Sequence, residues 1–313
     1  MAYRSTKRSS YARRRYPARK YGGTKKRRAS TKKRPTYRRK SRTMSKKSIL
    51  NMTSRKKRNG MTCVSNTNTT GTAQAIAPNA LYISAGQDAI CLFSPTAMDL
   101  VDYSGAVDSV VNQAQRTAST CFMRGFKENI RIQTSTGLPW FWRRICFTYK
   151  GNDFRSKYTD TPTYNTAGTP WIDTSNGMER LWLNSNINTQ PTTISNWVTR
   201  LFKGTVNVDW SDFITAPIDT SRISLKFDKT KTIKSGNSVG TVAEYKMWHP
   251  MNQNLVFDDD ESGEAESSQY FSVDSKAGMG DYYIIDFIQG GSAGSSSDVL
   301  RLQSSSTLYW HEK

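Results

Sequence analysis

Acidic residues are absent from the first 87 positions of this sequence, and the first one is Asp88. Aliphatic residues are also nearly absent before Ile49 and Leu50. Basic residues, in contrast, are abundant: residues 1–58 contain 25 Lys and Arg. A segment with so little apolar surface cannot offset the entropy that ordering costs, so residues 1–58 are expected to form a disordered arm in the free protein.

Histidine and cysteine are scarce as well. The chain has two histidines, His249 and His311, and four widely spaced cysteines without a C-x-x-C pair. A zinc site is therefore not expected, and the cysteines are expected to be reduced and buried. They are Cys63, Cys91, Cys121 and Cys146. The motifs G-x-x-x-x-G-K-[ST], G-x-G-x-x-G and H-E-x-x-H are missing too, so we expect no enzyme activity, no cofactor and no metal.

Long apolar runs are also lacking. No stretch approaches the roughly 20 apolar residues that span a bilayer. The basic N-terminus is not followed by the apolar segment of a secretory signal. We therefore expect an intracellular, soluble protein that does not associate with a membrane.

The charge is divided unevenly along the chain. The 313 residues carry a net charge of +21, yet residues 59–313 contain 21 basic and 25 acidic residues, a net charge of −4. This body is large enough for a substantial core and contains no stretch that resembles an interdomain linker. Two parts are predicted: a basic arm, residues 1–58, and a single domain, residues 59–313.

The arm's basic residues occur in clusters, with tyrosines such as Tyr11, Tyr16 and Tyr37 between them. Like charges at this density repel one another unless a polyanion neutralises them. Each Lys or Arg that meets a phosphate releases counterions, and tyrosine can stack on unpaired bases. The predicted DNA-binding residues are Arg13, Arg14, Arg15, Arg19, Lys20, Lys25, Lys26, Arg27, Arg28, Lys32, Lys33, Arg34, Arg38, Arg39, Lys40, Arg55, Lys56, Lys57 and Arg58.

Three of these clusters also suit nuclear import receptors, which bind short Lys/Arg-rich motifs. They are residues 25–28, 32–34 and 55–58. The two roles are compatible, because one basic segment can serve import first and bind nucleic acid afterwards.

Segments rich in aromatic and β-branched residues recur along the body, separated by turn signals. Many strands with few helices favour an all-β fold, an antiparallel sandwich or barrel. The expected strands are residues 88–94, 120–133, 140–149, 222–228, 241–248, 268–273, 281–289 and 298–310. Within 222–228, the alternation predicts that Ile223, Leu225 and Phe227 lie on one face.

One segment has helical periodicity instead. Apolar residues in 193–203 follow the i, i+3, i+4, i+7, i+8 spacing of an amphipathic helix. They are Ile194, Trp197, Val198, Leu201 and Phe202. Thr192 or Thr193 is predicted to cap the start of this short inserted helix, and Gly204 to end it.

The most enzyme-like cluster is acidic and lies in residues 258–266. Carboxylates at this density can hold a divalent metal for phosphodiester chemistry, or make an intersubunit contact with a basic neighbour. The accompanying Ser262, Gly263 and Ser267 favour a third interpretation, a solvated surface loop. The run fits a calcium loop badly, since the twelfth position from Asp258 is Gln269 rather than Glu.

The strand expected at 140–149 has two interpretations. Trp140, Trp142 and Arg144 should share one face. Phe141, Arg143 and Ile145 should share the other. One interpretation is a core strand with its arginines at the margin. The other is a surface on which Trp and Arg stack on single-stranded bases.

Three stretches together resemble a known family. They are the start MAYRSTKRSSYARRRYPARKYGG, the segment RTASTCFMRGFKENIRIQTSTGLPWFWRRICF and the end LRLQSSSTLYWHEK. The sequence is similar to the capsid proteins of genomoviruses (gemycircularvirus-like), which are small circular single-stranded DNA viruses, and more distantly to geminivirus coat proteins. The resemblance covers nearly the whole chain, and FMRGFKENI and WFWRRI are its most specific parts.

The resemblance implies a single jelly roll of eight strands in two sheets, with about 60 copies in a small icosahedral (T=1) shell around circular single-stranded DNA. It implies that the basic arm faces the interior and contacts the genome. Virion and host nucleus are the implied locations. Two other functions stay open at this point: a non-assembling nuclear nucleic-acid-binding protein with a basic tail, and a nuclease that uses Asp258, Asp259 and Asp260.

Overall fold

The computed structural model describes residues 43–313. The disorder expected for residues 1–42 lies outside the described residues. The helices are α1 (Lys46–Thr53), α2 (Pro191–Leu201) and the short 3-10 helix η1 (Ser185–Ile187). The strands are β1 (Arg55–Met61), β2 (Cys63–Thr67), β3 (Ala73–Ala77), β4 (Leu81–Ser84), β5 (Ala89–Phe93), β6 (Thr120–Thr134), β7 (Trp140–Tyr149), β8 (Ile172–Thr174), β9 (Gly177–Trp182), β10 (Ser224–Ile233), β11 (Val242–Val256), β12 (Asp260–Ser262), β13 (Ala265–Ser267), β14 (Asp281–Gly290) and β15 (Val299–Glu312).

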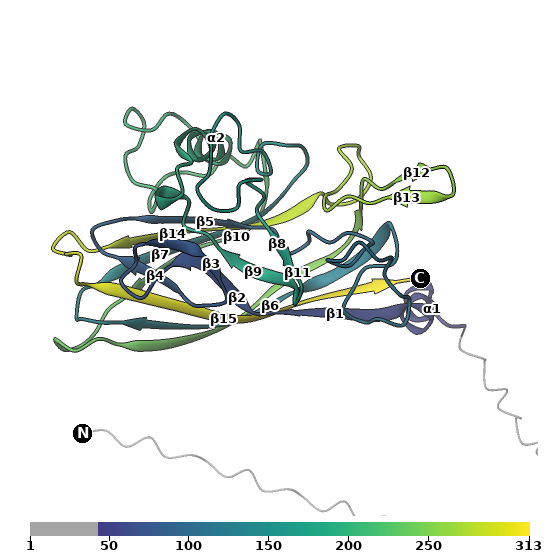
Figure 1. Cartoon of the computed structure of the whole chain (residues 1–313), viewed down its shortest axis with the longest axis horizontal. Coiled ribbons are helices and arrows are strands. Elements are labelled where there is room, and N and C mark those ends of the chain that lie inside the picture. The colour runs from purple at the N-terminus through teal and green to yellow at the C-terminus, as the bar shows by residue number, and fades with distance from the viewer. Residues whose placement is uncertain (1–42) are drawn as a thin grey trace, which may run out of the picture. The chain divides into compact units, whose positions relative to one another are not determined.

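Two antiparallel sheets face each other (Figure 1). The first has the order β4-β15-β6-β11, and β1 pairs with the same edge of β15 beyond β4. The second has the order β10-β7-β14-β5. The chain crosses between the sheets at β4–β5, β5–β6, β6–β7, β10–β11, β11–β14 and β14–β15. This connectivity is that of an eight-stranded jelly roll, so the predicted all-β sandwich with one short inserted helix is confirmed.

The core between the sheets follows the two-residue period of the strands. In β6, Ile130 and Ile132 are buried while Asn129 and Arg131 are exposed. The buried side chains of β6 and β15 meet those of β7, including Trp140. All four cysteines are free and buried, as predicted.

The second sheet is covered on its outer face as well. Trp197, Val198 and Leu201 of α2 pack against outward-facing residues of β5, β7 and β14 (Figure 1). This explains why β14 reads as an unbroken buried run over its first eight residues. The outer face of the first sheet remains exposed: along β6 and β11, outward-pointing side chains are solvent-accessible.

The helix prediction is confirmed in position but wrong about its caps. α2 starts at Pro191, two residues before the expected start. Gln190 precedes it without a side-chain cap, and Phe202 follows as the C-cap residue. The backbone N–H groups of Thr192 and Thr193 instead donate to the carboxylate of Asp160, at 3.3 and 2.6 Å. A distant loop therefore supplies the acceptor, which local sequence cannot indicate.

Seven of the eight expected strands are present. The prediction of a strand at residues 268–273 is wrong. That segment has a single bridge, Phe257 to Ser272. The alternation predicted for residues 222–228 is also wrong, because a bulge shifts the register between Leu225 and Phe227. Leu225 packs on the α2 side of the sheet, and Phe227 packs between the sheets.

The boundary predicted between residues 58 and 59 is corrected by the strand pairing. The compact body begins at Lys46, and β1 pairs along its whole length with β15, from Arg55 with Glu312 to Met61 with Ser306. Backbone pairing with a core strand orders residues that their composition assigned to the arm.

Candidate functional site

Most predicted DNA-binding residues lie outside the described residues, namely all those from Arg13 to Lys40. The last cluster of the predicted arm is described, and it forms the start of β1. Arg55, Lys56 and Arg58 are exposed there, so their guanidinium and ammonium groups stay available to phosphate.

The prediction that Lys57 binds DNA is wrong. Its ammonium lies 3.0 Å from Oε2 of Glu312 and donates to the carbonyl of Gln115 at 2.8 Å and to Oγ1 of Thr117 at 2.7 Å. Both side chains of this ion pair are buried. Lys57 therefore neutralises a buried carboxylate and is unavailable to DNA, because the strand period turns it inward between exposed neighbours.

The hypothesis that the β7 arginines and tryptophans stack on bases is wrong. Trp140, Trp142 and Arg144 are all buried between the sheets. Arg143 is buried on the opposite face, where it contacts Asp228 at 2.9 Å and the carbonyls of Phe213 and Ala216. The core-strand interpretation holds, except that its arginines lie inside rather than at the margin.

Arg144 belongs to a buried network of two guanidinium groups and two carboxylates. Arg144 bonds both oxygens of Asp286, at 2.7 and 2.9 Å, and one oxygen of Glu128. Arg180 of β9 bonds the other oxygen of Glu128 at 3.0 Å and reaches Asp286 at 3.3 Å. Burial alone would raise the pKa of Glu128, but the two guanidinium groups outweigh it and hold that pKa well below its usual value. The network ties β9 to both main sheets and is structural.

The acidic segment 258–266 divides into two parts. Most of it is the exposed hairpin β12–β13, as the surface-loop interpretation predicts. Asp259 differs, because Arg116 clamps it with hydrogen bonds to both carboxylate oxygens and both side chains are fully buried. Within residues 43–313, no group of three or more His, Cys, Asp or Glu is placed to hold a metal ion. The pairing with Arg116 makes Asp259 unavailable as a metal ligand.

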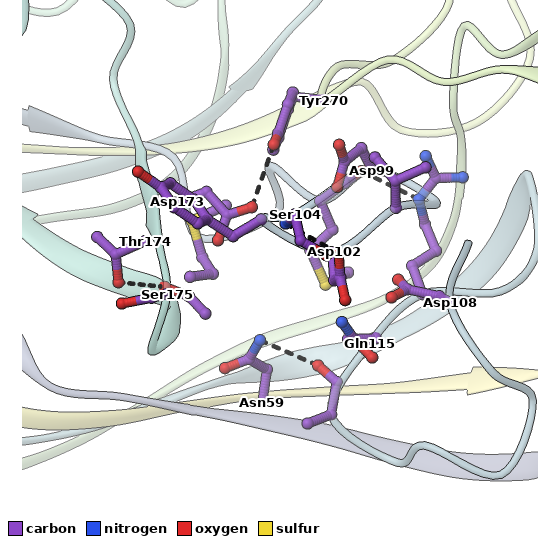
Figure 2. Close-up of a pocket in the computed structure, with 17 residues that line it drawn as sticks. Asn59, Asp99, Asp102, Ser104, Asp108, Gln115, Asp173, Thr174, Ser175 and Tyr270 are labelled. Atoms are coloured by element: carbon purple, nitrogen blue, oxygen red, sulfur yellow. Dashed lines mark hydrogen bonds between the residues drawn. The ribbon is translucent and has the colours of Figure 1, made fainter. Parts of the chain in front are cut away.

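A second acidic feature appears only in three dimensions. Four aspartates, three from residues 99–108 and one from the distant residue 173, line a pocket of about 330 Å³ together with Tyr270 (Figure 2). They are Asp99, Asp102, Asp108 and Asp173. The hydroxyl of Tyr270 donates to Asp173 at 3.1 Å, and Arg116 lines the pocket as well. Desolvation, together with the charges of Asp99 and Asp102, raises the pKa of Asp108 to about 7.

Asp108 should make the stability of the body depend on pH. Its pKa is about 7 in the folded protein, against about 3.9 in an unfolded chain. The folded state holds the proton more tightly, so this group lowers stability as pH rises from about 4 to about 7. Asp108→Asn should therefore raise the melting temperature at pH 8 and leave it nearly unchanged at pH 4, as measured by thermal unfolding.

Asp298 is the matched control outside this pocket. Hydrogen bonds from Thr136 and Ser295 lower its pKa, so Asp298→Asn should lower the melting temperature at pH 8. Equal shifts of the same sign for the two variants at pH 8 would contradict the assignment of the raised pKa to Asp108.

Sequence reasoning missed the basic and aromatic residues on the exposed face of the first sheet. Lys127, Lys246 and Trp248 belong to this face. A signal was available, because residues 120–133 alternate polar and apolar types, but alternation does not say what an exposed face will meet.

No protein-family model matches the sequence, and no curated protein is similar to it. In the described part of the chain, no helix is long and apolar enough to cross a membrane.

Proposed function

We propose that this protein is a viral capsid protein that assembles into a small icosahedral shell and packages circular single-stranded DNA through its basic N-terminal segment. The observation that carries the proposal is the combination of a jelly roll, a fold typical of viral capsids, with a leading segment that has 25 Lys and Arg and no acidic residue before residue 59. The resemblance to genomovirus capsid proteins supports the same function. The role is structural rather than catalytic.

The distribution of charge supports coupled assembly and packaging. The body from residue 59 carries a net charge of only −4, so copies can approach one another without strong repulsion. The leading segments repel each other until a polyanion neutralises them. Symmetric tiling of the bodies closes the shell, and binding to DNA removes the repulsion.

The proposal also assigns partners and locations. The partners are genomic single-stranded DNA, further copies of the same chain and host nuclear import receptors, and the locations are the virion and the host nucleus. For import, residues 25–28 and 32–34 are the better candidates, because β1 includes residues 55–58 and Lys57 is buried.

The number of charges predicts the size of the packaged genome. A shell of about 60 copies with about 25 basic residues each would neutralise on the order of 1,500 phosphates, with mobile cations covering the rest. The purified protein is therefore expected to form uniform particles in negative-stain microscopy that contain a circular single strand of a few kilobases. Extraction and sequencing of the DNA measure this length.

Two outcomes would contradict the proposal. A protein that stays monomeric with and without DNA would favour the non-assembling nuclear DNA-binding protein. A packaged genome ten times longer than a few kilobases would rule out the small shell.

A further inference from the structure

The exposed face of the first sheet carries an unusual concentration of positive charge. Seven basic residues of β1, β6, β11 and β15 lie on it: Lys56, Arg58, Arg124, Lys127, Arg131, Lys246 and Arg301. These four strands contain three acidic residues, and two of them, Glu128 and Glu312, are buried on the inner face. The third, Glu244, pairs with Arg131 at 2.9 Å. The face is therefore strongly cationic although the body as a whole is nearly neutral.

The strand register places these cations in rows across the sheet. Arg58 lies opposite Tyr309, and Lys127 lies between Thr307 and Trp248. Neighbouring strands are about 4.8 Å apart, and each residue adds about 3.3 Å along a strand. From His311 to Arg301 the face extends for ten residues of β15, about 33 Å. That length accommodates several nucleotides of an extended strand.

Aromatic rings lie among the cations. Trp248 is 48% exposed, and its ring centroid lies 5.9 Å from that of Tyr309. The indole lies against the backbone of β6, since a Cβ atom at Gly125 would be 2.6 Å from Cζ2 of Trp248. A glycine is required there, and it supports the ring from one side. Phe122 and His311 form a second pair at 6.0 Å.

The other sheet offers no comparable surface. Its outer face is covered by α2 and the flanking loops, which pack on β5, β7 and β14 (Figure 1). Among the described residues, the cationic and aromatic groups therefore coincide on the face that the fold leaves open. Cations bind the phosphates, and exposed rings stack on bases that are not paired.

We propose that this face is a second binding surface for single-stranded nucleic acid, in which Trp248 and Tyr309 stack on unpaired bases while Lys56, Arg58, Lys127 and Lys246 contact phosphates. The inference rests on the proposed function, because it takes packaged single-stranded DNA as the ligand. It differs from the leading basic segment in its location, because its stacking rings and cations lie on paired strands of the folded body.

The test compares two oligonucleotides on the full-length protein. One is a thymidine strand of about 30 nucleotides, and the other is an abasic strand with the same number of phosphates. The wild-type protein should bind the thymidine strand at least about tenfold more tightly, because stacking requires bases. Trp248→Ala with Tyr309→Ala should remove most of that preference while leaving affinity for the abasic strand nearly unchanged.

Matched controls separate stacking from charge. Tyr103→Ala removes an aromatic ring that is 66% exposed but lies off the face, and should preserve the preference for bases. Lys127→Ala with Lys246→Ala should reduce the slope of log affinity against log salt by about 1.4, at about 0.7 per phosphate contact. The exposed pair Lys226 and Lys276, changed to Ala in the same way, should leave the slope nearly unchanged.

The outcomes distinguish this inference from the proposed function. Photocrosslinking of the thymidine strand, followed by peptide mapping, should label residues around 248 and 309. Equal binding of both strands by the wild-type protein, or crosslinks confined to residues 1–45, would overturn the inference and leave packaging by the basic segment intact. Failure of the wild-type protein to bind either strand would instead contradict the proposed function.

Discussion

A chain that begins at Lys46 should unfold at the same temperature as the full-length protein but bind single-stranded DNA on the order of 100-fold more weakly at low salt. Residues 1–45 contain 19 of the 46 Lys and Arg residues, and the compact body begins at Lys46. Removing these cations removes most of the counterion release that drives binding. Filter binding over a salt series measures the affinity, and thermal unfolding measures the stability.

A longer deletion provides the control. Removing residues 1–58 also removes more than half of β1 and leaves Glu312 buried without Lys57. An unpaired buried carboxylate costs about 3 kcal/mol or more, so this variant should be clearly less stable than the chain that begins at Lys46. Equal stability of the two deletions would show that β1 contributes nothing to the body. Undiminished DNA affinity in the shorter deletion would place the main binding surface within residues 46–313.

Arg144→Met should destabilise the body by about 3–5 kcal/mol. The substitution leaves Asp286 without its bidentate partner and Glu128 with Arg180 as its remaining guanidinium partner, and both carboxylates are fully buried. Water cannot solvate them there, so the cost is that of an uncompensated buried charge. Chemical denaturation monitored by tryptophan fluorescence measures the free energy of unfolding.

Arg131→Met is the matched control for that experiment. Arg131 makes a similar ion pair, 2.9 Å from Glu244, but the two side chains are 55% and 58% exposed. An exposed pair contributes less than about 1 kcal/mol. Comparable losses for the two variants would show that burial of the network does not determine its contribution.

Glu128 also gives the network a pH dependence. Because its pKa is lowered in the folded protein, the stabilisation is present above the unfolded pKa of about 4.3 and is lost as pH falls below it. This direction is opposite to that of Asp108, whose pKa is raised. The contributions of these two groups together should therefore favour folding most where the two ranges meet, at about pH 4 to 5.

Sequence patterns were reliable where a residue's own strand or helix decided its environment. The alternation of Ile130 with Arg131, and the helical spacing of Trp197 and Leu201, predicted burial and exposure correctly. These patterns failed where a contact with a residue far away in the chain determined whether a side chain is buried. Lys57 has the same side chain as its neighbour Lys56, yet it is buried and pairs with Glu312, which lies opposite the first residue of β1.

By itself, the amino-acid sequence determined the separation of charge, the strand-rich sandwich and the reduced, buried cysteines, because these follow from composition and local periodicity. Only the tertiary structure decided which charged side chains are exposed and can bind a ligand. It buried Arg144, Arg180 and Lys57 against carboxylates, and it assembled the cationic aromatic face from strands that are distant in the sequence. The physical reason is that solvation and pairing of a charge depend on neighbours in space, and the order of residues along the chain does not specify them.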